Sequence, residues 1–427
     1  MNKIYNPNRS EWDSITERPL ISLSELEPIV KGVFDKIKTK GDAALRHYTL
    51  QFDKVQIENF QVTEQEVEEA NQLISKELKD AIAVAYQNVK KFHESQQLQS
   101  QKIETTEGVT CWQESRPIQK VGIYIPGGSA PLFSTVLMLG VPATIAGCEQ
   151  IVLCTPPNAE GKIHPAILYT AQLIGIKLIY KVGGIQAIGA MTFGTTTIAN
   201  VYKIFGPGNQ YVTAAKQVAV EYGLAIDMPA GPSELLVVAD ETCVPAFVAA
   251  DLLSQAEHGA DSQVICVVNN EKTLLEIEAE VAQQLAVLPR KAIAEKAIEK
   301  SRLVLIENQK DSLDFINEYA PEHFIIATQN EDFYIQNIVN AGSVFIGNYT
   351  PESAGDYASG TNHTLPTNGY ARTYSGVNLD TFTKKITFQK ITAAGMRNLG
   401  NTIELMAEAE LLHAHKNAVT LRLEQLK

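Results

Sequence analysis

The feature that most constrains the fold is a regular alternation of short apolar runs and longer helical segments over residues 120–229. The short runs include KVGIYIP, EQIVLC and KLIYKVGG, which are typical of buried strands. The segments between them include HPAILYTAQLIGI and QYVTAAKQVAVEYG, which have helical length and spacing. Strands that alternate with helices predict a mostly parallel, doubly wound sheet. The pattern restarts at residue 233 and runs to 348, so we expect two α/β units in tandem.

The chain has 427 residues, which is more than one hydrophobic core usually supports. Amphipathic runs within residues 20–100 predict helices before the first unit, and the chain ends in the helical pattern AEAELLHAHKNAVTLRLEQLK. We therefore expect an α/β fold with two tandem doubly wound, incomplete Rossmann-like domains, a helical N-terminal segment and a helical C-terminal tail. The expected boundaries are residues 1–24 for an N-terminal arm, 25–119 together with 235–374 for one α/β domain, 120–234 for the other, and 375–427 for the tail.

The charge balance and the apolar segments narrow the class of protein. Lys+Arg 36 against Asp+Glu 49 gives a net charge of −13, which argues against a nucleic-acid partner. The first residues lack the apolar core of a secretory signal. Only residues 130–147 are long and uncharged enough to suggest a membrane span, but Gly140 and Pro142 interrupt them, which favours a buried helix. We expect a soluble, cytoplasmic protein with no membrane partner.

The five cysteines are scattered along the chain and form no CxxC pair. This usage fits a reducing compartment better than a disulfide framework, and it excludes a thiolate zinc site of the usual spacing. A metal in this protein would therefore be held by nitrogen and oxygen ligands.

Two motifs in the second unit place candidate ligands or proton-transfer groups next to one another. In QAEHG, Gln255 and His258 are three residues apart and share a face at a helix end, although such a pair taken alone is more often a solvated terminus. In YAPEHF, Glu322 and His323 stand at the start of a strand. An adjacent carboxylate and imidazole can supply two proton-transfer groups at one site, and the alternative is a helix end with a solvated histidine.

Further candidates lie toward the C-terminus. The stretch ESAGDYASGTNH carries Asp356 and His363 in what we expect to be a loop, either functional or merely flexible. In the tail, HAH puts His413 and His415 on different faces of a helix, and spacing alone favours pairing His413 with Glu410. The residues by themselves do not choose between the two histidines.

Three glycine-rich turns follow strands of the first unit: YIPGGSAP, VGGIQAIG and FGPGNQYV. None is the G-x-G-x-x-G fingerprint of common dinucleotide-binding proteins. Each nevertheless leads from the carboxyl end of a strand into a helix, where the backbone can approach a phosphate and the helix N-terminus favours an anion. Three such turns in one unit indicate a nucleotide or another anionic ligand rather than tight turns alone.

Taken together, these segments resemble the histidinol dehydrogenase family. The matching blocks occur in order: RPIQKVGIYIPGGSAPLFSTVLMLGVPA, VGGIQAIGAM, KIFGPGNQYV, AIDMPAGPSE, DLLSQAEHG, YAPEH, SAGDYASGTNHTLPT and AHKNAVTLR. They are nearly continuous from residue 116 to 422, and the match is looser over the first hundred residues. The resemblance implies oxidation of L-histidinol to L-histidine in two NAD-dependent steps through the aldehyde, with a bound zinc ion.

The resemblance also implies roles for individual residues, and makes 120–234 the NAD-binding domain and the other α/β domain the zinc and substrate domain. The implied zinc ligands are Gln255, His258, Asp356 and His415. The implied catalytic pair is Glu322 and His323. Substrate contacts are expected at Ser233, Gln255, His258, His323, Asp356, His363, Glu410 and His415, and NAD contacts at Tyr124, Gln186 and Asn209. The family's tail crosses a homodimer, so each site is expected to be completed by the partner chain.

Chemistry assigns the catalytic pair different tasks. His323 has an ordinary pKa near neutrality and suits the removal of the alcohol proton, while Glu322 is the candidate to activate water for the aldehyde step. Because Glu410 and His415 are five residues apart, both would reach one site more easily if the helix ended or bent between them.

Four alternatives remain open. Cys154 or Cys111 could form a thiohemiacetal with the aldehyde, the fold could carry a zinc hydrolase, the substrate could be another amino alcohol, or the chain could be a non-enzymatic metal- or nucleotide-binding regulator.

Overall fold

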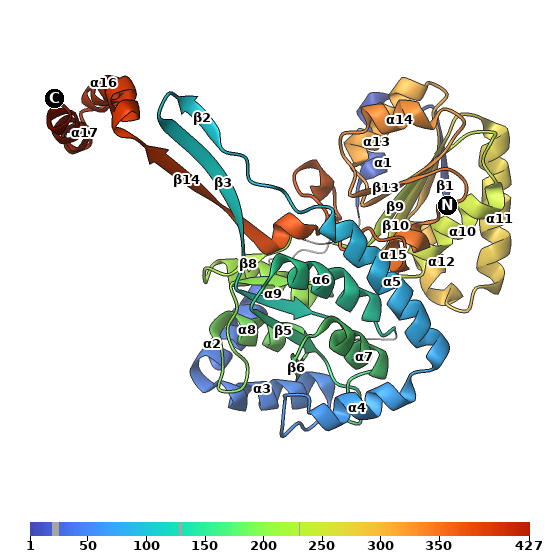
Figure 1. The fold of residues 1–427 in the computed structure, drawn as a ribbon. Coiled ribbons are helices and arrows are strands. Elements are labelled where there is room, and N and C mark those ends of the chain that lie inside the picture. The colour runs from blue at the N-terminus through green and yellow to red at the C-terminus, as the bar shows by residue number, and fades with distance from the viewer. Residues whose placement is uncertain (19–24, 128–129, 230) are drawn as a thin grey trace.

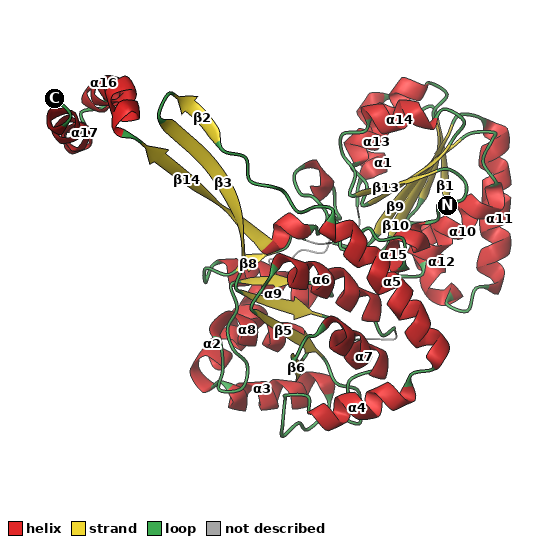
Figure 2. Ribbon diagram, viewed as in Figure 1, coloured by secondary structure: helices red, strands yellow, loops and turns green. Residues whose placement is uncertain are grey.

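The computed structural model describes residues 1–18, 25–127, 130–229 and 231–427. Two parallel sheets with helices on both faces form the body of the molecule, and a three-stranded antiparallel sheet projects from it (Figures 1 and 2). The expected fold class, two doubly wound α/β units with helical segments at both ends, is confirmed.

The first unit is built on a five-stranded sheet in the order β6-β5-β4-β7-β8, with every pair parallel. Its strands are β4 (Lys120–Tyr124), β5 (Gln150–Thr155), β6 (Leu178–Lys181), β7 (Lys203–Phe205) and β8 (Ala225–Ile226). Counted along the chain, this is the 3-2-1-4-5 order of a doubly wound sheet, in which the connections reverse direction between β4 and β7. A ligand crevice is expected outside the carboxyl ends of the strands at that reversal.

Helices cover both faces of this sheet and bury two apolar clusters against it. One face carries α2 (Glu27–Lys40), α3 (Asp42–Tyr48), α8 (Gly184–Phe193) and α9 (Gln210–Val220). The other carries α4 (Glu64–Leu73), α5 (Lys76–Glu94), α6 (Phe133–Ala146) and α7 (Pro165–Ile174). Helix α6 is the long apolar segment of the sequence, and it is buried as expected. Within the described residues, no helix is both long and apolar enough to cross a bilayer.

The packing of the N-terminal helices differs from the expected grouping. We expected residues 25–119 to belong with residues 235–374, but α2 packs on α8 and α9, α4 packs on α7, and α5 packs on α6. The N-terminal helices thus complete the five-stranded unit. The apolar faces of these helices are not specific for one sheet, so amphipathic periodicity alone could not assign them.

The second unit is built on a six-stranded parallel sheet in the order β1-β11-β10-β9-β12-β13. Its strands are β1 (Asn2–Tyr5), β9 (Glu234–Ala239), β10 (Gln263–Val268), β11 (Arg302–Leu305), β12 (His323–Ala327) and β13 (Ser343–Ile346). Its helices are α10 (Pro245–Ala256), α11 (Glu271–Val287) and α12 (Lys291–Glu299) on one face, and α1 (Trp12–Thr16), α13 (Gln309–Tyr319) and α14 (Glu331–Asn337) on the other. The edge strand β1 was not foreseen, since four residues carry no readable alternation.

Only the helical end of the projecting arm was predicted from the sequence. It consists of β2 (Ile103–Thr106), β3 (Val109–Pro117) and β14 (Thr383–Ile391), followed by α16 (Ala393–Ala409) and α17 (His413–Gln425). The tail is therefore not helical throughout, because β14 pairs antiparallel with β3 along nine residues of each strand. Figure 1 shows α16 and α17 at the far end of this arm, well away from both parallel sheets.

The turn after β7 generates a stability prediction. Gly206 has φ +125°, and a Cβ placed there would overlap the carbonyl oxygen of Tyr124 at the end of β4. Gly206→Ala should therefore lower the free energy of unfolding by about 2–4 kcal/mol, since strained φ and overpacking act together. Denaturant unfolding followed by circular dichroism measures the change.

Gly175 is the matched control, because its φ is +90° but a Cβ there meets nothing within 4 Å. Gly175→Ala should cost only the backbone term, about 1–2 kcal/mol. Equal losses in the two variants would contradict the steric explanation.

Candidate functional site

Two adjoining cavities carry the candidate site: the larger is lined by the first unit alone, and the smaller lies where the two units meet. The larger, about 1150 Å³, lies against the carboxyl ends of β4 and β5 and the N-termini of α7, α8 and α9. The smaller, about 450 Å³, extends from the turn after β7 to the amino ends of β9 and β12. Pro126 and Asn209 line both, so a ligand in the first cavity can reach into the second.

The larger cavity contains the three residues expected to contact NAD. Tyr124 accepts a hydrogen bond at its hydroxyl from the Gly184 N–H (3.0 Å), and Asn209 caps α9 by accepting from the N–H groups of residues 211 and 212. Gln186 donates through Nε2 to Asp53 (3.2 Å), while its Oε1 is buried and has no partner among the described residues. Helix N-termini fit the phosphates of an anionic ligand such as a dinucleotide, and the free buried acceptor fits a hydrogen-bond donor group of such a ligand.

The smaller cavity is lined by Ser233, His258, Glu322 and His363. Ser233 precedes β9, and Glu322 precedes β12, so both stand at the amino edge of the six-stranded sheet. Four of the residues that the resemblance assigns to substrate binding or catalysis therefore face one space. Parallel strands place these positions together because neighbouring strands start at the same edge.

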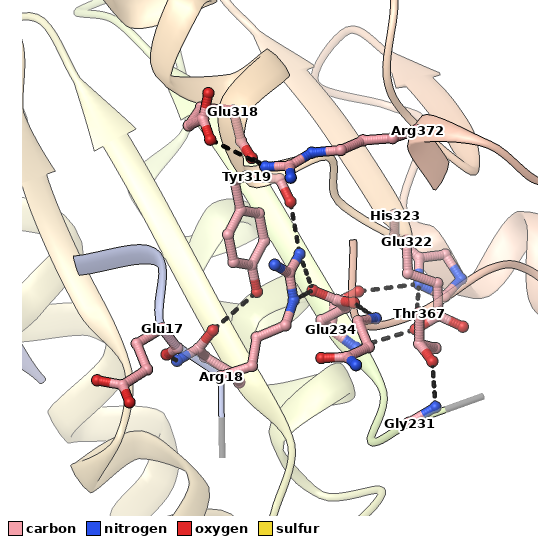
Figure 3. A network of polar contacts seen from close by, with 12 residues as sticks. Glu17, Arg18, Gly231, Glu234, Glu318, Tyr319, Glu322, His323, Thr367 and Arg372 are labelled. Carbon is pink, nitrogen blue, oxygen red and sulfur yellow. Dashed lines mark hydrogen bonds and ion pairs between the residues drawn. The ribbon is translucent and has the colours of Figure 1, made fainter. Parts of the chain in front are cut away.

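Glu322 and His323 form a buried acid–imidazole pair (Figure 3). His323 Nδ1 lies 3.6 Å from Glu322 Oε2 and 3.9 Å from Glu352 Oε1, and Nε2 lies 3.7 Å from Asp356 Oδ1. Burial alone would lower the pKa of His323, but the surrounding carboxylates outweigh it and raise this pKa well above its ordinary value. Nε2 itself has no hydrogen-bond partner within the described part of the chain.

A cluster beside this pair has the composition of a cation site. His258, Glu352 and Asp356 each offer one ligand atom, and these atoms lie within 4.8 Å of one another. Zinc bonds to nitrogen and oxygen are about 2.0–2.2 Å long, so side-chain adjustments alone would bring such atoms onto one ion. Burial raises the pKa of Glu352 to about 8, with His323 opposing this shift and the neighbouring carboxylates of Asp356 and Glu322 adding to it.

Gln255, the expected amide ligand, adjoins the same cluster from the last turn of α10. Orienting its amide so that both atoms have partners directs the nitrogen to the Glu352 carboxylate (3.2 Å) and the oxygen to the Glu234 N–H (3.1 Å). The chain leaves the helix at Glu257, so His258 is reached through a turn rather than along a continuous helix. The amide, His258 and Asp356 thus lie in one neighbourhood.

The segment that carries Asp356 and His363 is not the flexible loop that the sequence allowed as one alternative. Asp356 lies on the short helix α15 (Glu352–Tyr357), which corrects the expectation of an irregular loop at this position. His363 joins this segment to the first unit, with Nδ1 2.9 Å from the Asp356 carbonyl oxygen and Nε2 3.1 Å from the Thr135 hydroxyl on α6. Burial lowers the pKa of His363, which keeps the ring neutral.

Glu410 and His415 do not join the site within one chain. Both are exposed and belong to the junction of α16 and α17 at the end of the arm (Figure 1). Helix α16 ends at Ala409, Leu411 has φ +61°, and α17 begins at His413. The helix is therefore interrupted between Glu410 and His415. A continuous helix would place these two side chains on different faces, and the interruption removes that obstacle to their reaching one site.

Sequence reasoning missed Glu352 and the polar residues behind the pair, Arg18 and Glu234. Glu352 stands four residues before Asp356, a spacing that would have paired the two carboxylates had a helix been recognised there. Neither cysteine proposed as a nucleophile lines the two cavities described above. Cys154 is fully buried, and burial raises its pKa, whereas Cys111 lies on β3 of the arm.

Comparisons with known proteins point to one family along the whole chain. A family model described as histidinol dehydrogenase matches residues 16–423. Histidinol dehydrogenase of Bacteroides thetaiotaomicron is 56% identical over 427 residues, covering 100% of both chains, and that of Vibrio parahaemolyticus is 51% identical, covering 98% of this chain and 97% of the other. The crystal structure of histidinol dehydrogenase from Elizabethkingia anophelis matches with a TM-score of 0.98 and 60% identity, covering 100% of this chain and 98% of that one. The chain belongs to the histidinol dehydrogenase family and is an oxidoreductase.

Proposed function

We propose that the protein oxidises L-histidinol through L-histidinal to L-histidine, the last step of histidine biosynthesis, and uses two NAD molecules and a bound zinc ion. The observation that carries this proposal is the junction of the two cavities at Asn209 and Pro126. A dinucleotide on the N-termini of α7, α8 and α9 would extend toward the space that Glu322 faces. An alcohol held in the smaller cavity would then lie within reach of both the hydride acceptor and the base.

The proposed metal ligands are Gln255, His258 and Asp356 of one chain with His415 of the tail. When bound, zinc would hold the imidazole and amine of the substrate and offset the carboxylate charge that raises the pKa of His323. Two neutral imidazoles, one carboxylate and an amide leave room for substrate nitrogen atoms. Ser233, His363 and the tail residue Glu410 are the further proposed substrate contacts, and Tyr124, Gln186 and Asn209 the proposed NAD contacts.

Protein groups supply the proton transfers. His323 takes the hydroxyl proton as the first hydride leaves the carbinol carbon for NAD, which yields the aldehyde and NADH. Glu322 then removes a proton from water as its oxygen adds to the aldehyde carbon, while His323 returns its proton to the carbonyl oxygen, giving a gem-diol and a neutral imidazole. His323 takes a proton from that diol as the second hydride leaves, and the carboxylic acid ionises. Two hydrides pass to two NAD molecules, which balances the four-electron oxidation.

Mixing the zinc-loaded protein with NAD and L-histidinol should produce NADH, measured by its absorbance, and a panel of other amino alcohols should react more slowly.

His258→Ala should lose bound metal, measured by elemental analysis, together with activity. The physical reason is that one neutral ligand of a small set is removed. His47→Ala, at an exposed position on α3, should keep both. Full metal content in His258→Ala would contradict the ligand assignment, and no NADH from the wild type would contradict the function.

The division of labour between the paired residues predicts a selective defect. Glu322→Gln should spare oxidation of L-histidinol and slow oxidation of supplied L-histidinal by about 10²-fold or more, because only the second half-reaction needs activated water. Single-turnover NADH formation from each substrate measures the two half-reactions. Equal losses in both would show that the residues do not divide the work in this way.

We also propose that the tail acts across a homodimer. Its support is the position of α16 and α17 at the end of the arm, away from the chain's own cluster (Figure 1), together with exposed apolar residues there: Leu405, Met406, Leu411, Leu412 and Leu421. The alternative is a tail that folds back on its own chain.

Mixing inactive Asp356→Ala and His415→Ala chains after dissociation and reassociation distinguishes these arrangements. A tail that acts in trans leaves one site intact in each mixed dimer, so random pairing should restore about a quarter of wild-type activity. A tail that acts in cis leaves a lesion in every site. No recovered NADH formation, with mixed dimers demonstrated by native mass spectrometry, would refute the crossing tail.

A further inference from the structure

The backbone of Glu234 contacts both proposed proton-transfer residues. Its N–H donates to Glu322 Oε2 at 2.9 Å and is shared with the Gln255 amide oxygen at 3.1 Å, and its carbonyl oxygen lies 3.2 Å from His323 Nδ1. A carbonyl oxygen can only accept, so Nδ1 carries a proton and donates. That bond fixes the imidazole tautomer and leaves the unpartnered Nε2 as the nitrogen available for the reaction. The position of one peptide segment at the start of β9 therefore sets the orientation of both groups.

The Glu234 side chain holds this segment in place. It is buried, with 2% of the side chain exposed. Oε2 accepts a hydrogen bond of 2.6 Å from Arg18 Nε, and Oε1 accepts from the Asn368 N–H. A buried carboxylate without a cationic partner would be strongly unfavourable, so Arg18 supplies the positive charge that offsets the cost of burying this side chain.

Arg18 is itself fixed from several directions (Figure 3). Its Nη2 donates to the Tyr319 carbonyl oxygen, and its guanidinium lies 4.0 Å from the centre of the Tyr319 ring. The Tyr319 hydroxyl donates to Gln263 Oε1 at 3.0 Å, and the Gln263 amide donates to the Glu17 carbonyl oxygen at 2.9 Å. These bonds close a ring that joins the N-terminal segment to α13 and β10, so the guanidinium has little freedom to follow a displaced carboxylate.

We propose that Arg18 is a positioning residue for the oxidation: through the Glu234 carboxylate it holds the β9 backbone that orients Glu322 and His323. This inference rests on the proposed function of that pair. Arg18 lines neither described cavity, so it acts without touching the substrate or the dinucleotide.

Arg18→Met tests the proposal in the full-length, zinc-loaded protein. Because both groups lose their fixed orientation, kcat should fall about tenfold or more for L-histidinol and also for L-histidinal. KM for each substrate and the bound metal content should stay within about twofold of wild type, since no substrate contact is removed. A loss confined to KM, or to thermal stability with kcat unchanged, would overturn the proposal.

Arg9→Met is the matched control. Arg9 lies in the same N-terminal segment, pairs with Asp311 (3.2 Å) and Asp314, and lies 5.1 Å from the centre of the Trp12 ring. Its side chain is 61% exposed, and its partners are remote from Glu234 in the sequence and belong to α13. Its removal should leave kcat within about twofold of wild type. A tenfold fall in this variant as well would mean that the N-terminal segment acts only as a general stabiliser.

Two milder variants decide the matter if Arg18→Met does not fold. Arg18→Lys keeps a cation at the carboxylate but loses the planar fork that spans Glu234 and Tyr319, so its kcat should fall less than that of Arg18→Met. Glu234→Gln keeps the side-chain shape, removes the ion pair and should lower kcat without raising KM. Wild-type kcat in both variants overturns the positioning role, whereas absence of NADH formation by the wild type overturns the proposed function instead.

Discussion

The site depends on how buried negative charge is balanced at the amino edge of the six-stranded sheet. Glu234, Glu322, Glu352 and Asp356 are buried or half-buried in one small region around His323. Removing several carboxylates from water without cations is costly, and the shifted pKa values record it: burial raises the pKa of Glu234 to about 7, against the opposing effect of its arginine partner. Arg18, the His323 imidazole and the proposed metal ion are the groups that balance this charge. The same three groups also serve the proposed reaction, either by positioning other groups or by taking part in it.

The two sheets contribute opposite edges to this arrangement. The five-stranded sheet offers the carboxyl ends of its strands and the N-termini of its helices, which is where doubly wound folds bind nucleotides. The six-stranded sheet offers its amino edge, which carries the acid–imidazole pair. The segment after α15 holds the edges together, through His363 on Thr135 and through Asn362, whose amide donates to a carbonyl of α6. The proposed reaction at this junction would require both units to keep their positions relative to one another.

Much of the site was predictable because its residues occur in short motifs with recognisable neighbours. Glu322 and His323 are adjacent in the sequence, so any strand that starts there presents both. Glu352 was not recognised from the sequence. Its partner Asp356 is four residues away on a helix of six residues, which is too short to show periodicity. Arg18 was not recognised for a different reason. It lies 216 positions from Glu234, and no local pattern links an N-terminal arginine to a strand so distant in sequence.

The sequence by itself determined the tandem α/β units, since alternating strand and helix patterns are local and survive without knowledge of the contacts that they make. It also indicated the motifs that carry the candidate ligand and acid–base side chains. Only the tertiary structure decided that residues 25–94 complete the five-stranded unit, that β1 and β14 join distant strands, and that α16 and α17 stand at the end of an arm. These features depend on which apolar faces and strand edges meet, and such pairings are set by the whole chain because many local segments offer equivalent surfaces.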